Sequence, residues 1–134
     1  PEEATTFYGA YRYLLEYLKT NNPKAFIFAI IPNKLHSATG GDYAHADEYI
    51  PQVRQAIIEL CTEYSIPYVD LFAESGISKM QIDIQTYYRS TTDIHLNDEG
   101  HKKISIPIQK RIVDYFKNKL IIPYSISENG TKVD

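Results

Sequence analysis

The sequence lacks several features that define specialised classes of protein. Cys61 is its one cysteine, which excludes an internal disulfide, and its place on an apolar helical stripe predicts a buried thiol. The net charge of −3 is spread without a long block of one sign, which argues against a nucleic-acid binder. The longest apolar run, 25–32, is far shorter than the roughly 20 residues that span a bilayer. No signal peptide is visible, and one cysteine leaves the cellular compartment open.

What the chain does contain is enough apolar sequence for one domain, with 43% hydrophobic residues among 134. Apolar residues recur at helical spacing, and two shorter runs are rich in β-forming residues. Pro107 is expected to kink or break the last helix, and residues 74–92 suggest short helical or irregular packed structure. The predicted helices span 2–20, 46–64 and 98–120, and the predicted strands span 25–31 and 67–72.

The order helix–strand–helix–strand–helix predicts a parallel β-α-β architecture, with the run 25–31 buried on both faces. Two strands are few for an open α/β sheet, which usually has about five or six. We therefore expect further strands before Pro1, and we predict one domain over 1–122 followed by a polar tail over 123–134. An exposed sheet edge or face would invite association, which predicts a homo-oligomer.

The densest chemistry of the sequence lies in the segment 92–101. Asp93 stands two residues before His95, and Asn97 carries the signal of a helix N-cap. Many hydrolases present a general base to a nucleophile through an Asp-His pair at the mouth of a helix. We predict that His95 is the base and that Asp93 orients its ring, while Gly100 allows a close approach of the helix.

Other polar residues offer weaker candidates. Asp70 lies near the end of a predicted strand, at the edge where α/β ligand sites gather, although a structural hydrogen-bonding role is favoured. The loop 33–43 and His45 are placed to shape substrate selectivity. Four residues of types that bind zinc lack a tight spacing motif, so no metal site is predicted: His36, His45, Asp47 and His95. No serine in the loops sits in a Gly-x-Ser-x-Gly elbow: Ser37, Ser75, Ser78 and Ser90.

The order of three short motifs resembles the SGNH/GDSL hydrolase family. They are Asn-Pro-Lys-Ala-Phe-Ile at 22–27, Ile-Pro-Tyr-Val-Asp-Leu at 66–71 and Asp-Ile-His-Leu-Asn at 93–97, and the match spans roughly residues 5–117. The resemblance implies a flavodoxin-like three-layer α/β/α fold, here truncated at its N-terminus. It also implies hydrolysis of esters by a Ser-His-Asp triad, without a metal or organic cofactor. The implied substrates are small-molecule esters, lipids and acetylated glycans.

The sequence departs from the family pattern in two places. The family's Gly-Asp-Ser nucleophile block is absent, and the family's aspartate usually stands three residues before the histidine, where this chain has Thr92. We expect the nucleophile to lie outside this chain and the isolated chain to be inactive. One alternative is a catalytically inert SGNH-like binding or structural module. An unrelated phosphate-binding domain is disfavoured, because no Gly-rich loop follows either strand.

Overall fold

The chain folds around a small parallel sheet covered by helices. The computed structural model describes residues 5–36, 45–120, 125–126 and 132–133. The main elements, in chain order, are α1 (Phe7–Asn21), β1 (Ala29–Ile31), α2 (Ala46–Glu63), β2 (Tyr68–Asp70), α3 (Leu71–Glu74), α4 (Gln81–Tyr87) and α5 (Asp98–Leu120). Two short strands, β3 (Ser125–Ile126) and β4 (Lys132–Val133), form an antiparallel pair.

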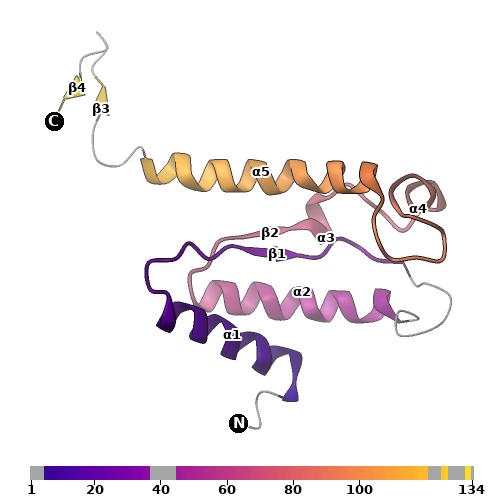
Figure 1. Cartoon of the computed structure of the whole chain (residues 1–134), viewed down its shortest axis with the longest axis horizontal. Coiled ribbons are helices and arrows are strands. Elements are labelled where there is room, and N and C mark those ends of the chain that lie inside the picture. Colours follow the sequence, from indigo (N-terminus) through magenta and orange to yellow (C-terminus); the bar gives the residue numbers. More distant parts are fainter. Residues whose placement is uncertain (1–4, 37–44, 121–124, 127–131, 134) are drawn as a thin grey trace.

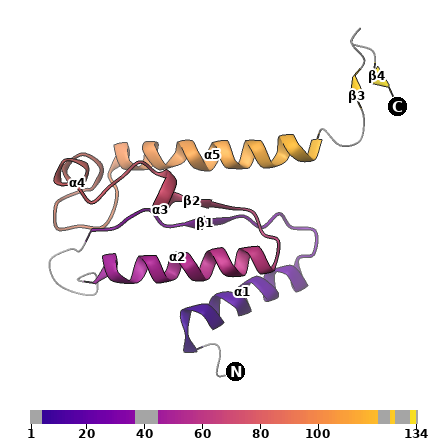
Figure 2. The ribbon, with the colours of Figure 1, turned by 180° about the vertical axis from the view of Figure 1, so that it is seen from behind.

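Strands β1 and β2 pair in parallel, with Ala29 opposite Tyr68 and Ile31 opposite Asp70. Helices α1 and α2 cover one face of this sheet, and α5 lies over the other face (Figure 1). The view from behind in Figure 2 shows the same three layers. The predicted parallel β-α-β unit and the α/β/α layering are therefore confirmed, in a structure where helices dominate.

The main core lies between β1 and the helices α1 and α2. Its buried members come from all three elements and from the segment before β2: Leu15, Ala29, Ile31, Ile57, Leu60, Cys61 and Ile66. The predicted burial of Cys61 is confirmed, and this burial raises the pKa of its thiol. A thiol with a raised pKa carries little of the nucleophilic thiolate, so Cys61 is a packing residue.

The predicted burial of the first strand on both faces is wrong. Strand β1 has three residues rather than the seven of the predicted run, and Ile30 is 48% exposed between the buried Ala29 and Ile31. Because successive side chains of a strand point to opposite faces, β1 is fully covered on the α2 side alone. The other face of the sheet is covered mainly at β2, which α5 contacts.

Two helices also differ from the prediction, one at its start and one at an internal proline. Helix α1 begins at Phe7, because the hydroxyl of Thr6 accepts a hydrogen bond from the Gly9 N–H at 3.0 Å and caps the helix, and residues 2–4 of the predicted helix lie outside the described residues. Helix α5 runs through Pro107 without a break, so of the two outcomes expected there, a kink or a break, the break is wrong. None of the helices in the described part of the chain combines the length and apolar character needed to cross a membrane.

Short helices occupy much of the region between β2 and α5. Helix α4 lies within residues 74–92, which confirms the expected short helical structure. Residues 37–43 of the predicted selectivity loop lie outside the described residues, as does most of the predicted tail 123–134.

Candidate active site

A buried acid ends the second strand. Asp70 is 7% exposed, and its Oδ2 accepts hydrogen bonds from Nε and Nη2 of Arg54 at 2.9 and 2.7 Å. Its Oδ1 accepts from the Ala73 N–H at 3.4 Å and so caps α3. The chain therefore turns into a helix after Asp70, and the predicted continuation of the strand to residue 72 is wrong. The favoured structural role of Asp70 is confirmed.

A short backbone bridge closes the loop that contains Asp93 and His95. Tyr88 and Leu96 pair antiparallel, and both are buried in a smaller apolar cluster with side chains from α4. Beside this bridge, the Arg89 N–H donates to the carbonyl of His95 at 2.9 Å. The apolar anchors fix both ends of the loop, so the residues between them are held in a defined place.

Asp93 and His95 contact each other directly within this loop. Oδ1 of Asp93 lies 2.6 Å from Nδ1 of His95 and 2.9 Å from the backbone nitrogen of the same residue. A carboxylate oxygen accepts, so Nδ1 carries the hydrogen, and in the neutral ring Nε2 carries the lone pair. The side chain of His95 is 58% exposed, which leaves the ring within reach of a bound molecule.

The surroundings of Asp93 favour its ionised form. The backbone hydrogen bond from His95 is the largest cause that lowers the pKa of this carboxyl, followed by the hydrogen bond from the His95 ring. The guanidinium of Arg89 adds a smaller effect, with its Nε 3.6 Å from Oδ2. The carboxylate is therefore charged across the neutral pH range, as a group that stabilises an imidazolium must be.

Asn97 joins the start of α5 to the end of α4. Its Oδ1 accepts from the Gly100 N–H at 2.9 Å, which confirms the predicted N-cap. Its Nδ2 donates to the carbonyls of Thr86 and Tyr88 at 2.8 and 3.1 Å. A Cβ on Gly100 would lie 2.3 Å from the carbonyl oxygen of Tyr87, so the predicted close approach of the helix is confirmed.

The four residues considered as zinc ligands do not form one group, since two of them contact Asp93 and the other two lie at the start of α2. Nε2 of His36 is 2.9 Å from the carbonyl oxygen of Asp93, and His95 binds the carboxylate of the same residue. His45 and Asp47 lie at the start of α2, where each contacts a charged side chain of its own. Within the described ranges, no three His, Cys, Asp or Glu residues are grouped to hold a metal ion.

The described loop serines make hydrogen bonds close to their own positions. The hydroxyl of Ser75 accepts from the Ile77 N–H, and the hydroxyl of Ser78 accepts from the Met80 N–H and donates to the carboxylate of Asp83 in α4. The hydroxyl of Ser90 lies 3.2 Å from that of Thr92. Ser37 lies outside the described residues.

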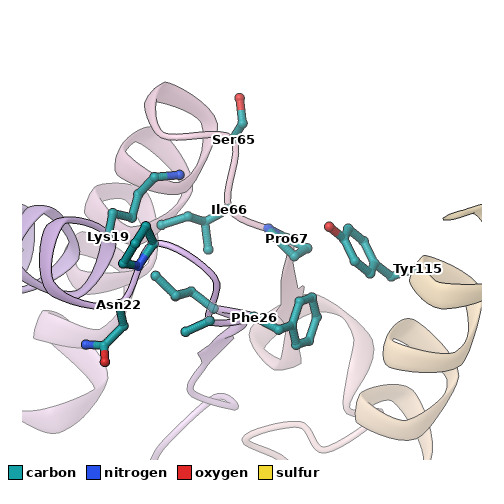
Figure 3. A pocket seen from close by; sticks show the side chains of 10 residues that line it. Lys19, Asn22, Phe26, Ser65, Ile66, Pro67 and Tyr115 are labelled. Atoms are coloured by element: carbon teal, nitrogen blue, oxygen red, sulfur yellow. The ribbon is translucent and has the colours of Figure 1, made fainter.

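Two hollows lie at opposite ends of the sheet. The narrower one, of about 370 Å³, lies where the chain enters β1 and β2, with Phe26, Pro67 and Tyr115 among its walls (Figure 3). Ligands of open α/β sheets bind beyond the other end of the strands, where a second hollow lies beside the Asp93–His95 loop, although neither Asp93 nor His95 is among its lining residues. This broad hollow, of about 650 Å³, is lined by Arg89, Leu96, Asn97, Asp98, Glu99 and His101.

Fold and site together define the class of this protein, an α/β/α domain with its polar site beyond the carboxyl ends of parallel strands. The chain belongs to the GDSL-like lipase/acylhydrolase family, whose model matches residues 1–103. The resemblance drawn from the three sequence motifs is thereby confirmed.

Two solved structures share the fold. The crystal structure of a protein from Lactobacillus plantarum, determined by a structural genomics consortium, matches with a TM-score of 0.72 and 26% identity, over 82% of this chain and 54% of that chain. A second crystal structure matches with a TM-score of 0.68 and 24% identity, over 83% of this chain and 53% of that one. The chain thus spans about half the length of each structure. No protein with a curated description matches it.

Sequence reasoning missed two residues that contact Asp93, namely Arg89 and His36. Arg89 stands four residues before Asp93, a spacing that carries no signal in a loop. His36 lies in the segment that follows Pro32 at the end of β1. Parallel strands bring their carboxyl ends to one edge, so a polar residue just beyond β1 was a candidate neighbour of this site.

Proposed function

We propose that this chain is the histidine- and aspartate-bearing part of a GDSL-type ester hydrolase. The observation that carries the proposal is the 2.6 Å contact between Nδ1 of His95 and Oδ1 of Asp93, with an exposed imidazole ring. Residues 1–122 form this part of the domain, and the nucleophilic serine comes from outside the chain. The substrates are esters of small molecules, lipids or acetylated glycans.

The proposed chemistry uses the two nitrogens of His95 for different tasks. Nδ1–H stays bound to Asp93, which fixes the tautomer, while Nε2 takes the proton of the serine hydroxyl as its oxygen attacks the ester carbonyl. The imidazolium then gives this proton to the leaving alcohol as the ester C–O bond breaks, and an acyl-serine remains. Water repeats the sequence and releases the acid. Asp93 stabilises the imidazolium in both halves of the reaction.

The test uses the native protein that carries this chain, with p-nitrophenyl acetate and butyrate as substrates. His95→Ala is expected to lower kcat by about 10³-fold or more, with little change in KM, because it removes a group that acts in the transition state. Asp93→Asn is expected to lower kcat strongly as well. The matched control is Asp114→Asn, which makes the same chemical change on an exposed part of α5 and should leave kcat unchanged.

A serine-directed fluorophosphonate locates the nucleophile in the same protein. The proposal expects one labelled serine outside residues 1–134, and slower labelling in His95→Ala. A label on a serine within the chain would reject the assignment of an external nucleophile. If the protein shows no hydrolysis and no labelling, the proposed enzyme is rejected and the inert binding or structural module is favoured. The missing Gly-Asp-Ser block supports that alternative.

We also infer that this chain, taken alone, associates with a second copy through the exposed side of its sheet. Ile30 of β1 and the contacting rings of Phe26 and Phe116 are each more than 40% exposed. Exposed apolar surface and sheet edges favour association. Sedimentation of the chain should give a dimer or larger species that Ile30→Lys shifts to monomer. A monomer in the unsubstituted chain at all concentrations would contradict the inference.

A further inference from the structure

A buried histidine beyond the end of β1 contacts the loop that carries Asp93 and His95. His36 is 6% exposed, and its Nε2 lies 2.9 Å from the backbone carbonyl oxygen of Asp93, which is 57 residues away in sequence. A carbonyl oxygen can only accept, so Nε2 of His36 carries a hydrogen and donates it. This hydrogen bond joins the segment after β1 to the residue that orients the His95 ring.

The ring of His36 is held by Tyr88. The two rings meet edge to face, with centroids 4.7 Å apart and planes at 90°. Tyr88 is itself fixed, since its hydroxyl donates to the Lys34 carbonyl at 2.5 Å and accepts from Asn33 Nδ2 at 3.1 Å. Burial is the main cause that raises the pKa of this phenol to about 12, which keeps it a donor at neutral pH.

Tyr88 therefore supports both sides of the contact. It pairs with Leu96 to close the Asp93–His95 loop, and it holds residues 33–36 through its hydroxyl and its ring. Because Tyr88 contacts both segments, it holds Nε2 of His36 at hydrogen-bonding distance from the carbonyl oxygen of Asp93. A buried hydrogen bond of this kind is costly to leave unmade.

We propose that His36 is a positioning residue of the candidate active site, which fixes the backbone of Asp93 and thereby the hydrogen bond that its carboxylate accepts from Nδ1 of His95. The inference rests on the proposed function, because it concerns the same Asp93–His95 pair. His36 acts through Asp93 and does not touch the reacting atoms. Without its donor, the Asp93 carbonyl loses an anchor, and the carboxylate is free to turn away from Nδ1 of His95.

The test compares three substitutions of one side chain. His36→Gln places an amide N–H at about the distance of Nε2, whereas the shorter side chain of His36→Asn cannot reach the Asp93 carbonyl. His36→Leu fills the space without a donor. His45→Gln is the matched control, because it removes an exposed histidine at the start of α2.

The measurement is the exchange with water of the His95 Nδ1 proton, followed by NMR in this chain with labelled histidine. His36→Leu and His36→Asn are expected to speed this exchange about tenfold, as the loss of one ordinary hydrogen bond predicts. His36→Gln and His45→Gln should stay close to the unsubstituted chain. The amide signals of Ile31 and Leu60 in the main core report whether each variant keeps its fold.

Unchanged exchange in folded His36→Leu or His36→Asn would overturn the proposal. Fast exchange in a folded His36→Gln variant would also overturn it, and this variant decides the matter if the other two fail to fold. Asp93→Asn separates the two inferences. If it leaves the His95 proton unaffected, the Asp93–His95 pair and the proposed function both fail. If Asp93→Asn speeds the exchange of the His95 proton and the His36 variants do not, the Asp93–His95 contact is supported and only the role of His36 is rejected.

Discussion

Asp93 reaches the ring of His95 across a spacing of two residues, with 2.6 Å between Oδ1 and Nδ1. The same Oδ1 accepts from the backbone N–H of His95, so the carboxylate closes a small turn that brings the ring toward it. The family pattern, with an aspartate three residues before the histidine, is therefore not needed for the contact. The departure seen at Thr92 leaves the pair intact.

The first prediction concerns the ionisation of Asp93. Its pKa should lie below the ordinary value of 3.8, because His95 donates two hydrogen bonds to the charged form. His95→Ala removes the ring contact and keeps the backbone donor, so the pKa should rise and still remain below 3.8. Titration of the Asp93 carboxyl carbon by NMR measures both values. A full return to 3.8 in His95→Ala would contradict the backbone contribution.

The same shift fixes the direction of the effect of pH on the loop. A group whose pKa is lower in the folded state stabilises that state above its unfolded pKa, here about 3.8, and the contribution is lost as pH falls through the folded value. We expect the Asp93–His95 loop to lose amide protection in acid. Asp93→Asn should remove this dependence and should leave the acid response of the remaining carboxyls unchanged.

The second prediction separates the two functions of Asn97. Asn97→Ala should lower the free energy of unfolding by about 2 kcal/mol, because it removes a cap and leaves carbonyls without donors. Asn97→Asp keeps the acceptor for Gly100 and replaces the donor to Thr86 and Tyr88 with a negative oxygen. Denaturant unfolding should show that Asp fails to substitute for Asn. If Asn97→Asp is as stable as the unsubstituted chain, capping of α5 is the sole contribution of Asn97 to stability.

The third prediction is that Gly100→Ala destabilises the protein although alanine favours helices by about 1 kcal/mol. The new Cβ would lie 2.3 Å from the Tyr87 carbonyl oxygen and 2.9 Å from Cβ of Leu96, so α5 must shift away. We expect a net loss of about 2 kcal/mol or more in the free energy of unfolding. The exposed Gln109→Ala in the same helix serves as the control and should change stability by less than about 0.5 kcal/mol. A stabilised Gly100→Ala variant would refute the close approach.

The fourth prediction concerns the acid at the end of β2. Arg54→Ala leaves the carboxylate of Asp70, a side chain that is 10% exposed, without its charged partner. Because the Arg54 side chain is 32% exposed, water screens part of the pair, and we expect a loss of about 1–3 kcal/mol. The double variant with Asp70→Asn should recover part of this loss. If denaturant unfolding of the double variant gives the sum of the two single losses in free energy, the two side chains are not coupled.

The fifth prediction tests the main core by making the same substitution, Leu→Ala, at one buried and one exposed position. Leu60→Ala removes a side chain with 0% exposure and should cost about 2–5 kcal/mol. Leu14→Ala makes the same change at a site that is 46% exposed and should cost far less. Thermal unfolding of both variants gives the comparison. Similar losses would mean that α1 packs through Leu14 as closely as α2 does through Leu60.

Much of the fold was predictable because its signals are local. The apolar stripe of α2 and the cap at Asn97 each depend on residues a few positions apart, and both are as predicted. Errors arose where a tertiary contact decides a boundary. Asp70 turns the end of β2 into α3, and the far side of β1 at Ile30 depends on which helix lies over it.

The sequence by itself determined the β-α-β order and the helix that begins after Asn97, because each is set by periodicity or by neighbours within a few residues. Only the tertiary structure decided that His36 donates to the backbone of Asp93 and that Arg54 binds Asp70. These contacts form because parallel pairing of β1 and β2 brings distant segments to one edge of the sheet. No short-range pattern in the chain encodes that proximity.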